Sequence, residues 1–204
     1  MKIERRSVRT LLVALILLFL GVSSSHGGEM SVVPGAPAAA TSKENTPFPA
    51  LDLPPPQSES ERAYLGISEV GAFKVNQIKA AVLIIEVFNF YCPHCQRAAP
   101  LVDKVYREIQ GRPDLKERVK MIGIGLANSA YEVNLFKEKY KVPFPLFPDK
   151  DMAILKKIVV LGTPTFIGVK VNEQGLQERF YLHPGTFDNP SKFLAEIITL
   201  SGLK

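Results

Sequence analysis

The fold of this chain is decided by the segment VLIIEVFNFYCPHC, which spans residues 82–95. Its first ten residues, Val82 to Tyr91, are almost all apolar, and most are β-branched or aromatic. Such a run is typical of a central strand that is covered on both faces. From Pro93 to about Ile109 the apolar residues recur at helical spacing, and Gly111 ends the pattern. The segment predicts a buried strand that leads into a helix, with two cysteines at the junction.

Strands and helices continue to alternate up to Lys204. Further strands are predicted at residues 119–124, 165–171 and 178–181, with a turn at 172–175 between the last two. Helices are predicted at 130–140 and 152–158, and a last helix is capped by Asp188 or Asn189 with Pro190 in its first turn. This order predicts one α/β domain over residues 61–204, with a central mixed β-sheet flanked by helices.

The first 25 residues have the three parts of a secretory signal. Residues 1–10 are basic, residues 11–22 form an unbroken apolar run, and Ser23–Ser25 supply small residues for a signal peptidase. A membrane span needs about 20 apolar residues, so the short run favours a cleaved signal peptide over a retained N-terminal membrane anchor. Export would place both cysteines in an oxidising space such as a bacterial periplasm.

Residues 26–60 are rich in Pro, Ala, Ser and Gly, and they hold seven of the 16 prolines. Proline removes backbone donors and favours an extended chain. The segment has little apolar periodicity, so we expect a flexible linker. The alternative is an ordered arm that lies on the domain and uses Phe48 and Leu51.

The distribution of charge gives no reason to expect a nucleic-acid partner. The formal net charge is +5, but the first 25 residues carry four basic side chains against one acidic side chain. The remaining chain, with 21 basic and 19 acidic residues, is close to neutral and has no basic stripe interleaved with aromatic residues.

Cys92 and Cys95 are the only cysteines, and two residues separate them. A disulfide between them would close a loop too small to stabilise the fold by loop closure. The N-terminus of a helix favours a thiolate at Cys92, and His94 would favour it further if it were charged or donated a hydrogen bond. We therefore expect a redox pair in which Cys92 exchanges disulfides and Cys95 resolves the mixed disulfide. The pair itself would be the redox centre, so no other cofactor is expected.

Other roles for the cysteines fit less well. A structural zinc site needs four ligands, and the chain offers only His26, His94 and His183 beside the two cysteines. Covalent haem attachment needs a histidine directly after the second cysteine, where Gln96 stands. An inert buried pair is a further alternative. A second functional hypothesis is a Cu(I) metallochaperone or binding module, because soft thiolates suit Cu(I).

At these residues the chain resembles the thioredoxin-like superfamily, and the resemblance covers most of residues 61–204. The segment IIEVFNFYCPHC at 84–95 is similar to the active-site segment of the DsbA-type disulfide oxidases, which share the Cys-Pro-His-Cys centre. The segments YKVPFPLFPD at 140–149, LGTPTF at 161–166 and GAFKVNQIK at 71–79 resemble the TlpA/ResA-type redoxins. The chain thus resembles a TlpA/ResA-type scaffold that carries a DsbA-like centre.

The resemblance implies roles for residues outside the cysteine pair. Pro164 matches a cis-proline that faces the active-site disulfide, and its loop exposes the backbone of Thr163 to an extended substrate peptide. Pro93 belongs to the active-site dipeptide, and Pro100 matches a proline that kinks the active-site helix.

Glu86 matches a buried acidic residue below the cysteines. A lone carboxyl in an apolar strand should have a raised pKa, and it could exchange a proton with Cys95. The alternative is a carboxylate that is satisfied by a nearby lysine such as Lys79.

These observations predict an exported thiol-disulfide oxidoreductase that acts on protein substrates. His94 favours an oxidase, whereas the TlpA-like body favours a reductase that a membrane electron-transfer partner keeps reduced; we slightly favour a reductase or general exchange. The segment after Cys95, Gln96-Arg97-Ala98-Ala99, lacks the glutamate that some ResA-type proteins carry, which weakens transfer of a cytochrome c maturation role. The loop pattern of a peroxide-reducing cysteine is absent around Cys92.

Overall fold

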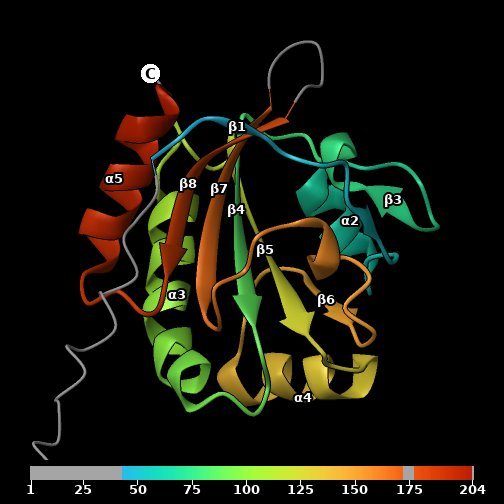
Figure 1. Cartoon of the computed structure of the whole chain (residues 1–204). Coiled ribbons are helices and arrows are strands. Elements are labelled where there is room, and N and C mark those ends of the chain that lie inside the picture. Colours follow the sequence, from blue (N-terminus) through green and yellow to red (C-terminus); the bar gives the residue numbers. More distant parts are fainter. Residues whose placement is uncertain (1–42, 172–176, 204) are drawn as a thin grey trace, which may run out of the picture. The chain divides into compact units, whose positions relative to one another are not determined.

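The computed structural model describes residues 43–171 and 177–203 (Figure 1). The expected signal peptide or anchor at 1–25, the first part of the expected linker at 26–42 and the expected turn at 172–175 lie outside the described residues. Within the described ranges, no helix has the length and apolar character needed to cross a bilayer.

The described residues form a six-stranded sheet in the order β1-β8-β7-β4-β5-β6 (Figure 1). Strands β4, β5 and β6 are parallel, whereas β7 runs antiparallel to β4, and β8 runs antiparallel to both β7 and β1. The predicted central mixed sheet is confirmed. The strand bounds are β1 Thr46–Pro47, β4 Val82–Phe88, β5 Val119–Leu126, β6 Leu146–Asp149, β7 Thr165–Val171 and β8 Gln177–Pro184.

Three helices begin after Ser58, Ser129 and Asn189, whose side chains satisfy free backbone donors, whereas the helix that follows Cys92 has no side-chain cap. The side chain of Asn189 accepts a hydrogen bond from the Lys192 N–H at 2.9 Å, and Ser129 forms a capping box with Glu132. The helix bounds are α2 Glu59–Leu65, α3 Pro93–Gly111, α4 Ala130–Tyr140 and α5 Pro190–Ser201, with 3-10 turns η1 at Val75–Gln77 and η2 at Leu155–Lys157.

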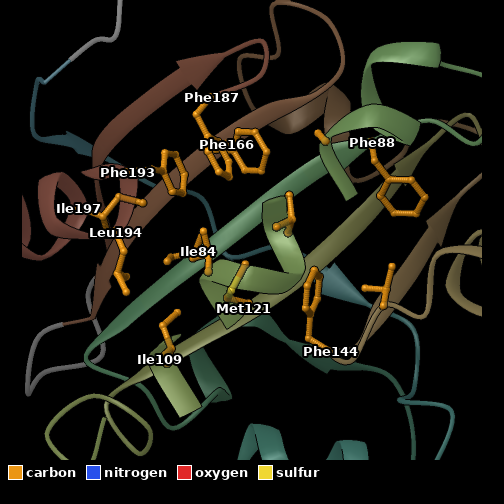
Figure 2. Packing of buried hydrophobic residues seen from close by; sticks show 14 of the residues in the cluster. Ile84, Phe88, Ile109, Met121, Phe144, Phe166, Phe187, Phe193, Leu194 and Ile197 are labelled. Carbon is orange, nitrogen blue, oxygen red and sulfur yellow. The ribbon is translucent and has the colours of Figure 1, made fainter. Parts of the chain in front are cut away.

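Each face of the sheet is covered by its own apolar cluster. On one face, α3, α4 and α5 pack against alternate residues of β4, including Ile84 and Phe88. Figure 2 shows this cluster, in which the ring of Phe166 on β7 lies 5.2 Å from the rings of both Phe187 and Phe193. The other residues of β4 face a second cluster built with the N-terminal part of the domain. Because both faces are covered, all seven residues of β4 are buried, as the sequence predicts.

The expected flexible linker is wrong for residues 43–60, which belong to the folded domain. Thr46 and Pro47 pair with β8 as an edge strand, where a proline is tolerated. Strand β2 (Asp52–Leu53) pairs with β3 (Phe73–Lys74), and the Leu51 and Leu53 side chains between these elements and the main sheet are fully buried. The ordered arm, held as the alternative, describes this segment correctly, because its few apolar side chains complete the second cluster.

The helix expected at residues 152–158 is also wrong, since the chain forms only the short turn η2 there. The buried carboxylate of Asp149 accepts the backbone N–H of Ile154 at 3.0 Å and that of Leu155 at 2.8 Å. Met152 has a φ of 57°, which a continuous right-handed helix does not contain. The apolar residues that suggested a helix pack as a turn against the second cluster instead.

Candidate functional site

The two cysteines lie at the junction between β4 and α3. Strand β4 ends at Phe88, three residues before the expected end, and residues 89–92 form a short loop. Cys92 is the N-cap residue of α3 and is partly exposed, whereas Cys95 lies one turn into the helix and is fully buried. Both cysteines are free thiols. The predicted junction is therefore confirmed, and it places one sulfur at the surface and the other beneath it.

The environment of the Cys92 sulfur lowers its pKa. Partial burial opposes ionisation, but hydrogen bonds from the Thr163 side chain, from the backbone N–H and thiol of Cys95 and from the backbone N–H of His94 outweigh it. These amides belong to the first turn of α3, where N–H groups have no partner within the helix. The helix N-terminus thus favours the Cys92 thiolate, as expected, and it does so through individual backbone N–H donors.

Cys95 has the opposite character. Burial raises the pKa of its thiol to about 12, although the backbone N–H of Asn89 and a hydrogen bond with Thr163 act in the other direction. The Cys95 thiol also donates to the Cys92 sulfur, which stabilises the thiolate of Cys92 at the expense of its own. The two sulfurs are therefore chemically different before any substrate binds.

The loop that precedes β7 approaches the exposed sulfur. The Thr163–Pro164 peptide bond is cis, as the resemblance implies. The Cys92 thiol donates to the Thr163 carbonyl oxygen at 3.2 Å, across 71 residues of sequence. The end of β8 holds this loop in place, because the N–H of Gly185 donates to the Pro164 carbonyl at 2.8 Å. The structure thus brings Cys92, Thr163 and Pro164 together.

The His94 ring does not supply the hydrogen bonds to Cys92 described above. The guanidinium of Arg97 lies 3.0 Å from its Nδ1. Arginine has no acceptor, so Nδ1 accepts this bond and the proton of a neutral ring lies on Nε2. His94 contributes to the Cys92 sulfur through its backbone N–H instead. Pro93 is the first residue of α3, and Pro100 lies inside the helix.

Glu86 lies on the face of β4 that carries Ile84 and Phe88, which is the face covered by α3. It is 2% exposed, and its Oε1 has no hydrogen-bond partner among the described residues. Burial raises the pKa of this carboxyl to about 8. The alternative of pairing with Lys79 is not what the structure shows, since burial is the cause of the shift and no ion pair with Glu86 is found in the described part of the chain.

Sequence reasoning missed the polar side chains that hold the loop between β4 and α3. Asn89, Gln96 and Asn128 each bond the backbone of this loop or of its neighbour. Tyr91, beside Cys92, donates its hydroxyl to Glu132 at 2.6 Å. The three amides have no recognisable spacing, because they come from the loop, from α3 and from the segment between β5 and α4.

Among residues 43–171 and 177–203, no group of three or more His, Cys, Asp or Glu side chains is arranged to hold a metal ion. The described chemistry of the site is that of two thiols, one buried carboxyl and the polar backbone around them.

A family model described as the AhpC/TSA family matches residues 47–185. The chain belongs to the AhpC/TSA family. The match to this family begins within the segment expected to be a linker, in agreement with the ordered arm seen in the structure.

This AhpC/TSA-family chain is similar to one curated protein over part of its length. The thiol-disulfide oxidoreductase ResA of Halalkalibacterium halodurans is 23% identical over 104 residues, which cover 51% of this chain and 55% of the relative. The chain thus spans about half the length of the curated relative it matches.

Two solved structures are similar throughout most of their length. StoA from Bacillus subtilis has a TM-score of 0.52 at 18% identity, covering 74% of this chain and 98% of that chain. A secreted Mycobacterium tuberculosis disulfide oxidoreductase homologous to E. coli DsbE has a TM-score of 0.51 at 16% identity, covering 64% of this chain and 90% of that chain. The expected thioredoxin-like fold on a TlpA/ResA-type scaffold is confirmed.

Proposed function

We propose that the protein is an exported thiol-disulfide oxidoreductase that exchanges disulfides with protein substrates through Cys92 and Cys95. The observation that carries this proposal is the asymmetry of the two sulfurs. The Cys92 sulfur is accessible and its pKa is lowered, whereas Cys95 lies buried beneath it with a raised pKa. A nucleophile at the surface and a protonated partner one helical turn below it are what a two-step exchange requires.

In the reducing direction, the Cys92 thiolate attacks one sulfur of a substrate disulfide. The substrate S–S bond breaks, a Cys92–substrate disulfide forms, and the other substrate sulfur leaves as a thiolate. Cys95 then loses its proton and attacks the Cys92 sulfur, so that the second substrate thiolate leaves and a Cys92–Cys95 disulfide remains. Two electrons pass to the substrate, and the oxidising direction is the same sequence in reverse.

The surrounding residues support peptide-level exchange. The Thr163 carbonyl, next to the cis Thr163–Pro164 bond, lies 3.2 Å from the Cys92 sulfur, and we propose that this backbone aligns an extended substrate peptide beside the reacting atom. Glu86, buried on the same side of β4 as α3, is proposed to take or give the proton of Cys95.

We favour a reductase or general exchange over an oxidase. The His94 ring contacts Arg97 and supplies no hydrogen bond to the Cys92 sulfur, so the support that this ring gives to an oxidase is removed, whereas the TlpA/ResA-type scaffold favours a reductase. A reductase also needs a dithiol donor to restore Cys92 and Cys95, and we propose a membrane electron-transfer partner outside the cytoplasm. The secreted Mycobacterium tuberculosis relative supports the proposed export.

The reduction potential of the Cys92–Cys95 couple tests the direction of exchange. Equilibration with glutathione or dithiothreitol should give a value nearer to about −270 mV than to about −120 mV, which is the potential of a strong oxidant. A value near about −120 mV would overturn the reductase assignment and leave an oxidase.

Substrate trapping tests the exchange itself. Cys95→Ser should accumulate mixed disulfides through Cys92, because the second step is lost, whereas Cys92→Ser should accumulate none. Insulin reduction should fall to background in both variants. Stoichiometric Cu(I) binding or peroxide consumption without any disulfide exchange by the wild-type protein would contradict the proposal.

A further inference from the structure

Three side-chain amides hold the loop between β4 and α3. Oδ1 of Asn128 accepts the Phe90 N–H at 2.8 Å, and the Gln96 Nε2 group donates to the Phe90 carbonyl at 2.9 Å. Both polar groups of the Phe90 backbone are therefore bound to side chains from elements outside the loop. A peptide unit with both groups bound in this way has little freedom to rotate.

Asn89 connects this loop to both cysteines. Its Nδ2 donates to the Leu126 carbonyl at 2.7 Å, and its Oδ1 accepts the Tyr91 N–H at 2.8 Å. Its carbonyl accepts the Cys92 N–H at 3.1 Å, and its own N–H donates to the Cys95 sulfur. The orientation of the Asn89 backbone thus sets the position of the N–H that binds the buried Cys95 sulfur.

The burial of Asn128 leaves one of its polar groups without a hydrogen-bond partner among the described residues. The residue is fully buried, and the group in question is its side-chain Nδ2. A Cβ at Gly125 would lie 3.1 Å from the Asn128 Cβ and 2.8 Å from Val133, so the amide fits because position 125 has no side chain. An apolar residue would avoid the unpaired donor. The bond to Phe90 is the interaction that an apolar residue at 128 would forfeit.

We propose that Asn128, acting through Phe90 and Asn89, is a positioning residue for the resolving step in which Cys95 attacks the Cys92 sulfur. This inference rests on the proposed disulfide exchange. In that step the S–S bond between Cys92 and the substrate breaks, a Cys92–Cys95 bond forms, and the substrate sulfur leaves with the electron pair. Before the attack, Cys95 gives its proton to a base, and the Asn89 N–H stabilises the resulting Cys95 thiolate.

Attack of one sulfur on another needs a defined approach, and a small misplacement of the nucleophile slows such a reaction strongly. The Asn128 hydrogen bond goes to the Phe90 N–H, and the donors to the Cys92 sulfur lie in the first turn of α3 and at Thr163. Loss of the Asn128 amide should therefore slow the second step and leave the first step nearly unchanged.

The reaction of the reduced full-length protein with 5,5′-dithiobis(2-nitrobenzoate) separates these steps. Attack by Cys92 releases one thionitrobenzoate, and attack by Cys95 on the resulting mixed disulfide releases a second. In Asn128→Ala we expect the second release to be about 10-fold slower and the first to change less than about twofold. Asn128→Asp keeps an acceptor oxygen for Phe90 and should restore most of the second rate, measured also at lower pH where the added carboxyl is protonated.

The matched control is Asn134→Ala. Asn134 is an exposed residue of α4, the helix that follows Asn128, and its side chain accepts a hydrogen bond from the Gln57 side chain at 2.6 Å. Its variant should match the wild type in both phases. Should Asn128→Ala fail to fold, as judged by circular dichroism, Asn89→Ala carries the same expectation, because it releases the loop from Leu126.

Equal slowing of both phases, no slowing of the second, or slowing that Asn128→Asp does not relieve would overturn the inference. Failure of the wild-type protein to release two thionitrobenzoates in succession would instead contradict the proposed function. The two failures are therefore distinguishable in one experiment.

Discussion

At the scale of single residues, burial raises the pKa of Glu86, Cys95 and Cys92, but only at Cys92 do hydrogen bonds outweigh it. Cys95 and Glu86 are both buried, and both have raised pKa values, so both are neutral at neutral pH or close to it. Partial burial also raises the pKa of Cys92, but hydrogen bonds from Thr163 and from Cys95 and His94 in α3 lower it by more. A site with two proton-bearing groups below one accessible thiol keeps a proton available for the leaving sulfur.

Glu86 should make the protein less stable as the pH rises. Its carboxyl ionises near pH 4.5 when unfolded but near about pH 8 when folded, so the folded state binds more protons between these values. The free energy of unfolding should fall by up to about 1.4 kcal/mol per pH unit across this window. Glu86→Gln should remove this contribution, so the free energy of unfolding of the variant should rise relative to that of the wild type from pH 5 to pH 9.

Urea unfolding of reduced protein at pH 5, 7 and 9 measures this difference. Glu138→Gln, at an exposed position on α4, is the matched control and should keep the wild-type pH dependence. Parallel curves for wild type and Glu86→Gln would show that Glu86 ionises alike in both states.

At the scale of elements, the first turn of α3 acts as a set of donors. Its backbone N–H groups at His94 and Cys95 bind the Cys92 sulfur, and the His94 ring is turned to Arg97 within the same helix. The identity of the side chain at 94 should therefore matter less than the presence of its N–H.

His94→Pro and His94→Ala separate these two contributions. Both remove the ring, but only proline removes the N–H, and the first turn of a helix tolerates it. One hydrogen bond is worth about 1 kcal/mol, so the Cys92 thiol pKa should be higher in His94→Pro than in His94→Ala by about 0.7. The pH dependence of Cys92 alkylation, located by mass spectrometry, measures both values; equal values would refute the role of this amide.

The N-terminal arm is a second element with a measurable contribution. Leu51 is fully buried between the arm and the main sheet, so Leu51→Ala should lower the free energy of unfolding by about 2–5 kcal/mol. Val70→Ala removes methyl groups from a side chain that is 76% exposed and should leave it almost unchanged. Similar urea midpoints for both variants would argue that the arm does not stabilise the domain.

At the scale of the whole molecule, the sequence predicts the features that depend on pattern. The apolar run at 82–91 predicts β4, the helical spacing after Pro93 predicts α3, and the cysteine spacing predicts the proposed redox pair. The bounds of α4 and β7 agree residue for residue. These elements succeed because both faces of a central strand, or one face of a long helix, must be apolar throughout.

What pattern does not predict depends on tertiary contacts. Residues 43–60 look like a linker because their strands are only two residues long, which is too short to show any periodicity. The role of Leu51 as a core residue depends on its packing against the sheet, which the local sequence does not reveal. The helix expected at 152–158 is prevented by hydrogen bonds to Asp149, a residue outside it. The Asn128 contact with Phe90 spans 38 residues of sequence and follows no motif.

The strand register also determines how the domain can be attached to anything that precedes it. Pro47 pairs with Glu178, Glu178 with Lys170, and Lys170 with Val82, so the arm joins the sheet level with the start of β4. Cys92 follows the other end of β4, which is seven residues long and so spans about 20 Å. A tether attached before Thr46 would hold the domain at the end of the sheet opposite to Cys92, so it would leave the partly exposed sulfur accessible to a protein partner.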